Sequence, residues 1–334
     1  ETDQARLVGG VRGGVTLGSP VALVLENKDH EHWLADMSPE EESFKPRRPV
    51  TRLRPGHADL AGALKYGHQD VRNVLERSSA RETAGRVAAG GVARKLLATF
   101  GITIFSFTRS IGEVTSREAC VDPAEVELEK VEQSPVRCPD PEAGAAMVAA
   151  IDEAKEAGDT LGGTFTVVAT GVPPGLGSHV HWDRKLDGRL AQALLSINAV
   201  KAVEFGAGFD GIRRPGSAFH DQIEARERRF RHLSNRAGGL TGGMSNGEPI
   251  EVTVGIKPIA TLKQPLLSAD LVTREPVKAH FERSDVCVVP AAGVIGEAMV
   301  ALTLADAFLE KFGGDSVPEI RRNLDGYLED IGWR

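Results

Sequence analysis

Two glycine-rich segments of this 334-residue chain share one pattern, and this repetition constrains the fold more than any other feature. Gly13-Gly-Val-Thr-Leu-Gly-Ser-Pro-Val21 recurs as Gly242-Gly-Met-Ser-Asn-Gly-Glu-Pro-Ile250, and a strand-like run follows each copy. An Arg-Ser pair and a long segment rich in small residues come after each run. We therefore predict a duplicated strand-plus-helix unit, at approximately residues 10–100 and 240–314. The alternative is two unrelated glycine turns before strands.

Apolar residues follow a strand pattern in some segments and recur at helical spacing in others. The predicted strands are Val21–Leu25, Gly162–Thr170 and Glu251–Ile256. The predicted helices are Ala80–Thr99, Ala291–Phe312 and Val317–Asp330. Ser79 and Glu82 have the spacing of a capping box at the start of the first helix. Both element types are therefore present.

No low-complexity linker divides the chain, so we expect a single domain over residues 1–334. Ala84, Ala88 and Gly91 form a small-residue face on the first predicted helix, which allows another helix or a sheet to approach closely. The charged stretch from Arg213 to Arg236 is predicted to be an exposed excursion.

Charge and cysteine content exclude several classes of protein. The formal net charge of -7 opposes general binding to nucleic acid or to an anionic membrane. Three scattered cysteines fit neither a disulfide framework nor a zinc site, so we expect no metal and a cytoplasmic location. The sequence shows no apolar run of membrane-spanning length and no export signal. It starts without methionine, and we expect further residues before Glu1.

The segment from Lys45 to Arg54 carries five basic side chains and two prolines. The prolines prevent helix formation, and the planar guanidinium of arginine suits phosphate or carboxylate recognition. A solvated basic loop is the alternative. A single-stranded RNA-binding protein is disfavoured by the net charge of -7 and by the aromatic content of 5%, because such proteins stack bases on exposed rings.

Three further segments carry residues suited to acid–base chemistry or anion binding. His57 lies two residues before Asp59, and histidine exchanges protons near neutral pH. Glu76-Arg-Ser-Ser-Ala-Arg-Glu82 is predicted to begin the first long helix, where free backbone N–H groups favour anions, and Arg283-Ser284-Asp285 precedes the second. Solvent-exposed arginines beside a helix cap are the alternative. The glycine-rich stretch Arg236–Gly247 allows close approach of a ligand to the backbone.

Together, in this order and at these intervals, the segments resemble the chorismate synthase family over nearly the whole chain. The resemblance rests on Arg54-Pro-Gly-His-Ala-Asp59, Glu76-Arg-Ser-Ser-Ala-Arg-Glu82, Trp182-Asp-Arg-Lys-Leu-Asp187, Asn235-Arg-Ala-Gly-Gly239, Gly242-Gly-Met-Ser-Asn-Gly247, Lys257-Pro-Ile259 and Arg283-Ser-Asp285. The segments around Ser78–Arg81 and from Arg283 through Glu297 match long family signatures.

This resemblance implies an α+β fold in which long helices are sandwiched between two antiparallel β-sheets, internally duplicated and assembled as a homotetramer. The implied reaction is the anti-1,4-elimination of phosphate from 5-enolpyruvylshikimate 3-phosphate to give chorismate, a carbon–oxygen lyase step of the shikimate pathway of aromatic amino acid biosynthesis. The implied cofactor is reduced FMN, although no net redox change occurs. Because no additional NAD(P)H-binding domain is visible, we expect an external flavin reductase, with NADPH acting indirectly.

The resemblance also implies roles for individual residues. His57 and Asp285 would be catalytic, His57 near the flavin ring and Asp285 near its reactive nitrogen, and Arg81 and Arg283 would hold substrate anions. The residues that would line FMN are Arg77, Ser78, Ser79, Asn198, Ala199, Gly242, Lys257, Pro258, Ile259, Ala260, Thr261 and Arg283. The FMN phosphate would lie on Lys257 and Thr261, a cation and a hydroxyl donor.

One family feature is missing from the chain. The Gly-Glu-Ser-His-Gly segment that carries another catalytic histidine, and the arginine-rich glycine loop that binds substrate, would both lie upstream of Glu1. We therefore expect the chain as given to have an incomplete active site. The alternative function is a non-catalytic anion- or nucleotide-binding protein on the same scaffold.

Overall fold

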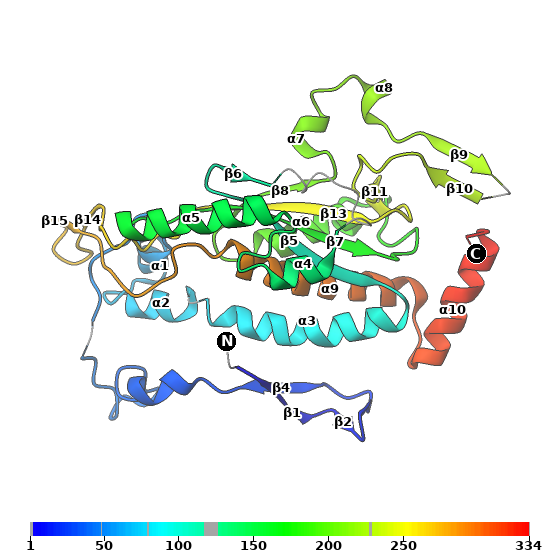
Figure 1. Cartoon of the computed structure of the whole chain (residues 1–334). Coiled ribbons are helices and arrows are strands. Elements are labelled where there is room, and N and C mark those ends of the chain that lie inside the picture. The colour runs from blue at the N-terminus through cyan, green and yellow to red at the C-terminus, as the bar shows by residue number, and fades with distance from the viewer. Residues whose placement is uncertain (1–2, 48, 79, 117–125, 227–228, 334) are drawn as a thin grey trace. The chain divides into compact units, whose positions relative to one another are not determined.

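The computed structural model describes residues 3–47, 49–78, 80–116, 126–226 and 229–333 (Figure 1). The chain divides into two compact units. The first unit comprises residues 1–88, 154–160 and 259–286, and the second comprises residues 89–153, 161–258 and 287–334. Every described strand pair is antiparallel, and helices accompany the strands in both units, as expected for the α+β class.

The second unit is built on a five-stranded antiparallel sheet with the strand order β6–β5–β7–β13–β8. The middle strand β7 (Gly163–Thr170) pairs with β5 (Thr103–Ile111) on one side and with β13 (Ile250–Ile256) on the other. The strands at the two edges are β6 (Val114–Thr115) and β8 (Val200–Phe205). The sequence therefore predicted β7 and β13 correctly, to within one residue at each end.

Alternate side chains of a strand point to opposite sides of the sheet, and in this sheet both sides are buried. Phe105 and Phe107 of β5 form a cluster with Val131 of α4 (Leu128–Gln133). On the other face α9 (Val289–Phe312) lies very close to β7. A Cβ atom added to Gly296 would come within 2.7 Å of the Phe165 ring, so the small residues of α9 bring its backbone against the sheet.

Helix α3 (Glu82–Thr99) also approaches α9 closely, but through a different glycine from the one predicted. A Cβ atom on Gly90 would lie 2.6 Å from the Cα atom of Ala298, whereas one on Gly91 would meet nothing within 4 Å. The small-residue face predicted at Ala84, Ala88 and Gly91 was therefore wrong at Gly91, because helical spacing alone does not fix which side of a helix faces its neighbour.

Further elements complete the second unit. They are α5 (Pro141–Ala157), which continues into the first unit, the short η4 (Trp182–Arg184), α6 (Leu186–Leu195), the hairpin of β11 (Leu240–Thr241) and β12 (Met244–Ser245), and α10 (Val317–Asp330). Between β8 and β11 the chain leaves the sheet as α7 (Gly208–Gly211), α8 (Gly216–Phe219), β9 (Ile223–Arg226) and β10 (Arg229–His232), at the top right of Figure 1. This excursion coincides with the charged stretch predicted to be exposed.

The first unit contains short helices and two-stranded ribbons. Its elements are β1 (Ala5–Gly9) paired with β4 (Ala22–Leu25), β2 (Val11–Arg12) paired with β3 (Val15–Thr16), η1 (Lys28–Trp33), α1 (Asp59–Tyr66), α2 (Arg72–Ser78), and β14 (Leu267–Ala269) paired with β15 (Pro276–Lys278). Val50, Leu53, Val71, Val74 and Leu75 form its buried core.

The two repeated glycine segments have the same local structure. Gly13 and Gly14 connect β2 to β3, Gly242 and Gly243 connect β11 to β12, and all four have positive φ angles. Both glycines of such a two-residue hairpin turn need this left-handed backbone. A longer strand follows each hairpin, β4 in one case and β13 in the other. The duplication of the whole units, and the single domain, remain predictions.

Among the described residues, one helix, α9, is long and apolar enough to cross a membrane by length and composition. The sequence pattern did not indicate such a segment. In this structure 61% of its most apolar window is buried, and it contacts the sheet and α6. The helix therefore forms the core of the second unit.

Glu297 of α9 is a charged residue in this core, with 4% of its side chain exposed. Its carboxylate accepts hydrogen bonds from Arg94 (2.7 Å), Arg137 (3.0 Å) and the Ser106 hydroxyl (2.7 Å). Burial raises the pKa of Glu297, and the hydroxyl and the two arginines act in the opposite direction. Arg137 also donates to Glu132, whose side chain is 67% exposed.

We predict that Glu297→Ala lowers the free energy of unfolding by about 3 kcal/mol, because Arg137 then loses its buried partner. Glu132→Ala is the matched control, since it removes an exposed carboxylate from the same arginine and should cost less than about 1 kcal/mol. Urea unfolding of both variants measures the difference. Equal losses would show that burial of the carboxylate is unimportant.

Candidate functional site

A buried ion pair forms the base of the candidate site in the first unit. Asp59, at the start of α1, is fully buried, and only 6% of the Arg54 side chain is exposed. Asp59 Oδ2 accepts from the backbone N–H and from Nε of Arg54, both at 3.0 Å, and Oδ1 accepts from Nη2 at 3.1 Å. Such a two-pronged contact fixes the guanidinium plane.

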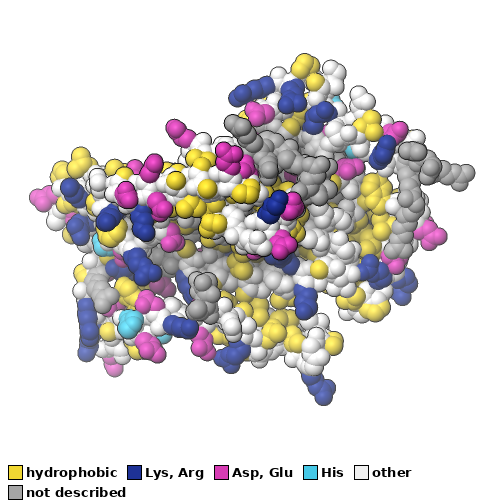
Figure 2. Space-filling model, viewed as in Figure 1, with side chains coloured by type: hydrophobic (Ala, Val, Ile, Leu, Met, Phe, Trp, Pro, Cys, Tyr) yellow, Lys and Arg dark blue, Asp and Glu magenta, His cyan; other side chains and the backbone are white. Residues whose placement is uncertain are grey.

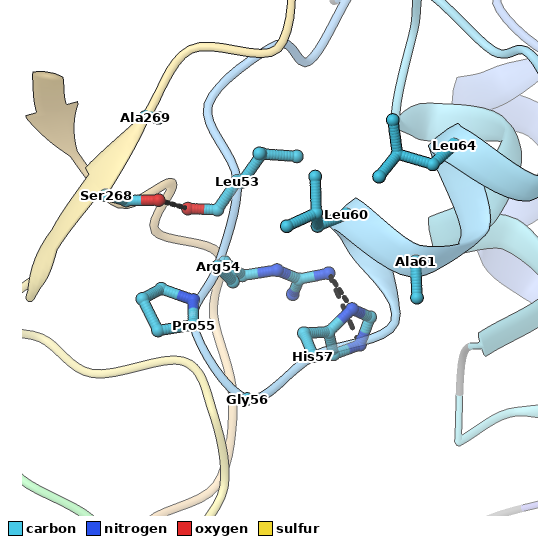
Figure 3. Close-up of a pocket in the computed structure, with 10 residues that line it drawn as sticks. All are labelled: Leu53, Arg54, Pro55, Gly56, His57, Leu60, Ala61, Leu64, Ser268 and Ala269. Atoms are coloured by element: carbon cyan, nitrogen blue, oxygen red, sulfur yellow. Dashed lines mark hydrogen bonds between the residues drawn. The ribbon is translucent and has the colours of Figure 1, made fainter. Parts of the chain in front are cut away.

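His57 lies against this pair, with 22% of its side chain exposed. Its Nδ1 atom forms a short hydrogen bond with Asp59 Oδ1. Arg54 Nη2 lies 3.1 Å from Nδ1 (Figure 3). Burial alone would raise the pKa of Asp59, but hydrogen bonds from His57 and Arg54 outweigh it and hold the pKa well below its usual range. Asp59 is therefore a carboxylate at neutral pH.

The same arginine connects this loop to a distant part of the sequence. Arg54 Nη1 donates to the hydroxyl of Thr261 at 3.2 Å, and Thr261 is 5% exposed. The Ser284 hydroxyl in turn donates to the carbonyl oxygen of Thr261 at 3.3 Å. His57, Thr261 and the Arg283–Asp285 segment therefore belong to one connected region of the first unit.

A cavity of about 680 Å³ opens beside Arg54 and His57. Its lining residues are Leu53, Arg54, Pro55, Gly56, His57, Leu60, Ala61, Leu64, Ser268 and Ala269. In Figure 3, Leu60 and Leu64 lie on α1, while Arg54 extends toward His57. The cavity therefore combines an apolar helical side with a cation and an imidazole, which suits an anionic organic ligand.

Asp285 and Arg283 are exposed and lie in a loop. They precede the second long helix, as the sequence predicted: α9 begins at Val289, close to the predicted Ala291, and its N-cap residue Val288 forms no side-chain cap. Asp285 is therefore not a helix cap.

The first predicted anion site was misplaced. Glu76, Arg77 and Ser78 form the last turn of α2, and α3 begins at Glu82, so this segment is not the start of one long helix. Ser79 lies outside the described residues. Arg81 is paired with Asp3 and donates to the Glu26 carbonyl oxygen at 2.9 Å. In this structure its guanidinium therefore binds residues next to β1 and β4.

The remaining predicted FMN residues fall in both units. In the second unit the backbone N–H of Lys257 donates to the Ala199 carbonyl at 3.0 Å, which brings Asn198 and Ala199 beside Lys257 and Pro258. Gly242 is exposed in the β11–β12 turn. In the first unit Ile259 and Ala260 are half-buried next to Thr261. Burial, and then the charge of Lys201, lower the pKa of Lys257.

The sequence did not assign roles to Arg54 and Asp59, although both were visible. Arg54 was counted with a basic segment, yet it is buried while Arg52 is exposed, and charge alone does not distinguish them. The spacing of His57 and Asp59 was the signal that pointed to the pair.

Among the residues that the structure describes, no group of His, Cys, Asp and Glu could hold a metal ion. Basic and acidic side chains are interspersed on the face shown in Figure 2.

Comparison with known proteins gives one consistent result. A family model described as chorismate synthase matches residues 1–309. A chorismate synthase from Desulforudis audaxviator is 57% identical over 332 residues, which cover 99% of this chain and 85% of that protein. A chorismate synthase from Symbiobacterium thermophilum is 55% identical over 344 residues, which cover 100% of this chain and 87% of that protein.

The structural comparison agrees with the sequence comparison. A crystal structure of chorismate synthase superimposes with a TM-score of 0.78 at 42% sequence identity, and the match covers 98% of this chain and 85% of that one. The predicted family and the α+β fold class are thus confirmed. All residues of the candidate site lie inside the region that the family model matches. The chain therefore belongs to the chorismate synthase family.

Proposed function

We propose that this chain is a lyase that catalyses the chorismate synthase reaction, the anti-1,4-elimination of phosphate from 5-enolpyruvylshikimate 3-phosphate. The observation that carries the proposal is the match at 57% identity over nearly the whole chain. The buried Arg54–Asp59 pair beside His57 supports it, because the substrate is a polyanion that also loses a ring proton. A non-catalytic binding protein on the same scaffold is not favoured by these comparisons.

The cofactor in this proposal is reduced FMN, which would supply an electron-rich ring beside the breaking C–O bond without net redox change. The chemistry of Lys257 fits the phosphate of such a group. Lys257 is half-buried near the like charge of Lys201, and the negative charge of a bound phosphate would offset both the cost of burying the ammonium group and the repulsion. Asn198 and Ala199, beside Lys257, would add polar contacts.

The residues of the first unit would handle the substrate and the proton. Arg283 would hold substrate anions from its exposed position, and Arg81 would do so after exchanging Asp3 for the ligand. His57, at the cavity, would exchange a proton with the bound ligands. Asp285 has an exposed carboxylate on the segment that Ser284 joins to Thr261, and it would help remove the ring proton.

The wider setting is part of the proposal. We infer a cytoplasmic homotetramer, because this is what the family resemblance implies. An external flavin reductase that uses NADPH would keep FMN reduced. No role for nucleic acid or membrane is proposed, in keeping with the net charge of -7.

We expect the full-length protein to form chorismate from 5-enolpyruvylshikimate 3-phosphate under anaerobic conditions with chemically reduced FMN. Chromatographic detection of chorismate and of released phosphate in equal amounts measures the reaction. Oxidised FMN is the control and should support no turnover. A folded protein that binds FMN and the substrate but forms no chorismate would contradict the proposed function.

We predict that Lys257→Ala weakens FMN binding at least tenfold, because a hydrogen bond between a cation and a phosphate contributes about 1.5–3 kcal/mol. Titration of FMN fluorescence or calorimetry measures the affinity. Lys95→Ala removes an exposed cation from α3 of the same unit and should leave the affinity unchanged. Unaltered affinity in folded Lys257→Ala protein would remove this lysine from the site.

We predict that in the full-length enzyme Asp285→Asn lowers turnover about 10²–10⁴-fold with little change in melting temperature, because the exposed side chain caps no helix and loses only its basicity. Asp210→Asn, at another exposed carboxylate, should change neither quantity. Near-normal turnover in Asp285→Asn would mean that the ring proton is removed by another group.

A further inference from the structure

Asp59 has no assigned role, yet it contacts both functional side chains of the cavity. It is fully buried and accepts three hydrogen bonds from Arg54 while it also contacts His57 Nδ1. We propose that Asp59 is a positioning residue that holds His57 in the tautomer protonated at Nδ1, so that His57 exchanges protons with its ligands through Nε2. The effect on catalysis rests on the function proposed above, whereas the tautomer does not.

The short contact between His57 Nδ1 and Asp59 Oδ1 determines where the proton lies. An ionised carboxylate can only accept hydrogen bonds, so Nδ1 must carry the hydrogen. The low pKa of Asp59, caused by its His57 and Arg54 hydrogen bonds against the opposing effect of burial, keeps it ionised. With Nδ1 as donor, the lone pair of the neutral ring is on Nε2.

The other possible donor to Nδ1 is Arg54, whose Nη2 lies 3.1 Å from it. A guanidinium cannot accept a hydrogen bond, so this contact would require Nδ1 to be unprotonated. Two acceptors, Nδ1 and Oδ1, would then face each other at short range inside a buried site, which is unfavourable. Arg54 Nη2 also has Asp59 Oδ1 as an acceptor at 3.1 Å and does not need Nδ1.

Arg54 also prevents Asp59 from turning away. It holds Oδ2 through its backbone N–H and Nε, and Oδ1 through Nη2, so both oxygens have fixed positions. Among the described residues, Arg54 and Asp59 are the charged groups that contact the His57 ring. The carboxylate therefore also offsets the charge of Arg54 next to the imidazole.

The geometry predicts what Asp59→Asn would do. Both donors at Oδ2 come from Arg54 and cannot become acceptors, whereas one of the two donors at Oδ1, His57, can change its tautomer, so the amide nitrogen would occupy the Oδ1 position. That nitrogen would donate toward His57 Nδ1, which would then have to accept, and the ring proton would move to Nε2. The variant has nearly the same shape as the native side chain but reverses the tautomer.

The test is ¹⁵N NMR of the full chain with labelled histidine, at a pH where His57 is neutral. The signals are assigned among the nine histidines by their loss in His57→Gln. We expect protonated Nδ1 in the native protein and protonated Nε2 in Asp59→Asn. Asp70→Asn is the matched control, since Asp70 accepts backbone N–H groups of Val50 and Arg72 and should leave the tautomer unchanged.

Turnover of the same variants in the full-length protein tests the catalytic consequence. Asp59→Asn should lower kcat by roughly 10²-fold or more with a small change in KM, and Asp70→Asn should leave kcat unchanged. A native His57 protonated at Nε2 would overturn the proposal even if Asp59→Asn failed to fold. An unchanged tautomer and kcat in folded Asp59→Asn would also overturn it. If native protein has no turnover, the function proposed above fails while the NMR result still decides the tautomer.

Discussion

The candidate site depends on the hydrogen bonds of the Arg54 guanidinium. This group joins the start of α1 through Asp59, the cavity through His57, and the Thr261 loop through a hydroxyl. A buried arginine is costly unless its donors are satisfied, and here they are shared among groups that all belong to the site. Because its geometry is planar and fixed, a lysine at this position would satisfy fewer of these partners.

A different constraint shapes the second unit. Small residues let α9 lie against the sheet at Gly296 and against α3 opposite Gly90. Such close contacts leave little room for water, so the carboxylate of Glu297, which is buried there, needs Arg94, Arg137 and Ser106 as partners. The apolar composition that would let α9 cross a membrane is the same composition that makes it a core helix.

Local patterns predicted local structure well in this chain. The helix at Val317–Asp330 and the strands β7 and β13 followed directly from periodicity, because burial on a regular element leaves a regular pattern. Family motifs pointed to His57, Thr261 and Asp285, and the roles of these residues remain predictions.

What the sequence did not give depends on contacts between distant residues. The break between α2 and α3 and the choice of Gly90 over Gly91 are set by neighbouring elements. The burial of Arg54 is another such case. Its partner Thr261 is 207 residues away in the sequence, and a local sequence pattern cannot predict a contact between residues so far apart.

That separation has a consequence for the order of events during synthesis. The first unit consists of residues 1–88 together with residues 154–160 and 259–286, so its last part leaves the ribosome long after its first. At about 5–20 residues per second, the 207 residues between Arg54 and Thr261 take roughly 10–40 s to make. During that interval the Arg54 loop exists without Thr261 and without the strands β14 and β15. The N-terminal part of the chain is therefore made first, yet its fold is completed only after most of the second unit has been translated.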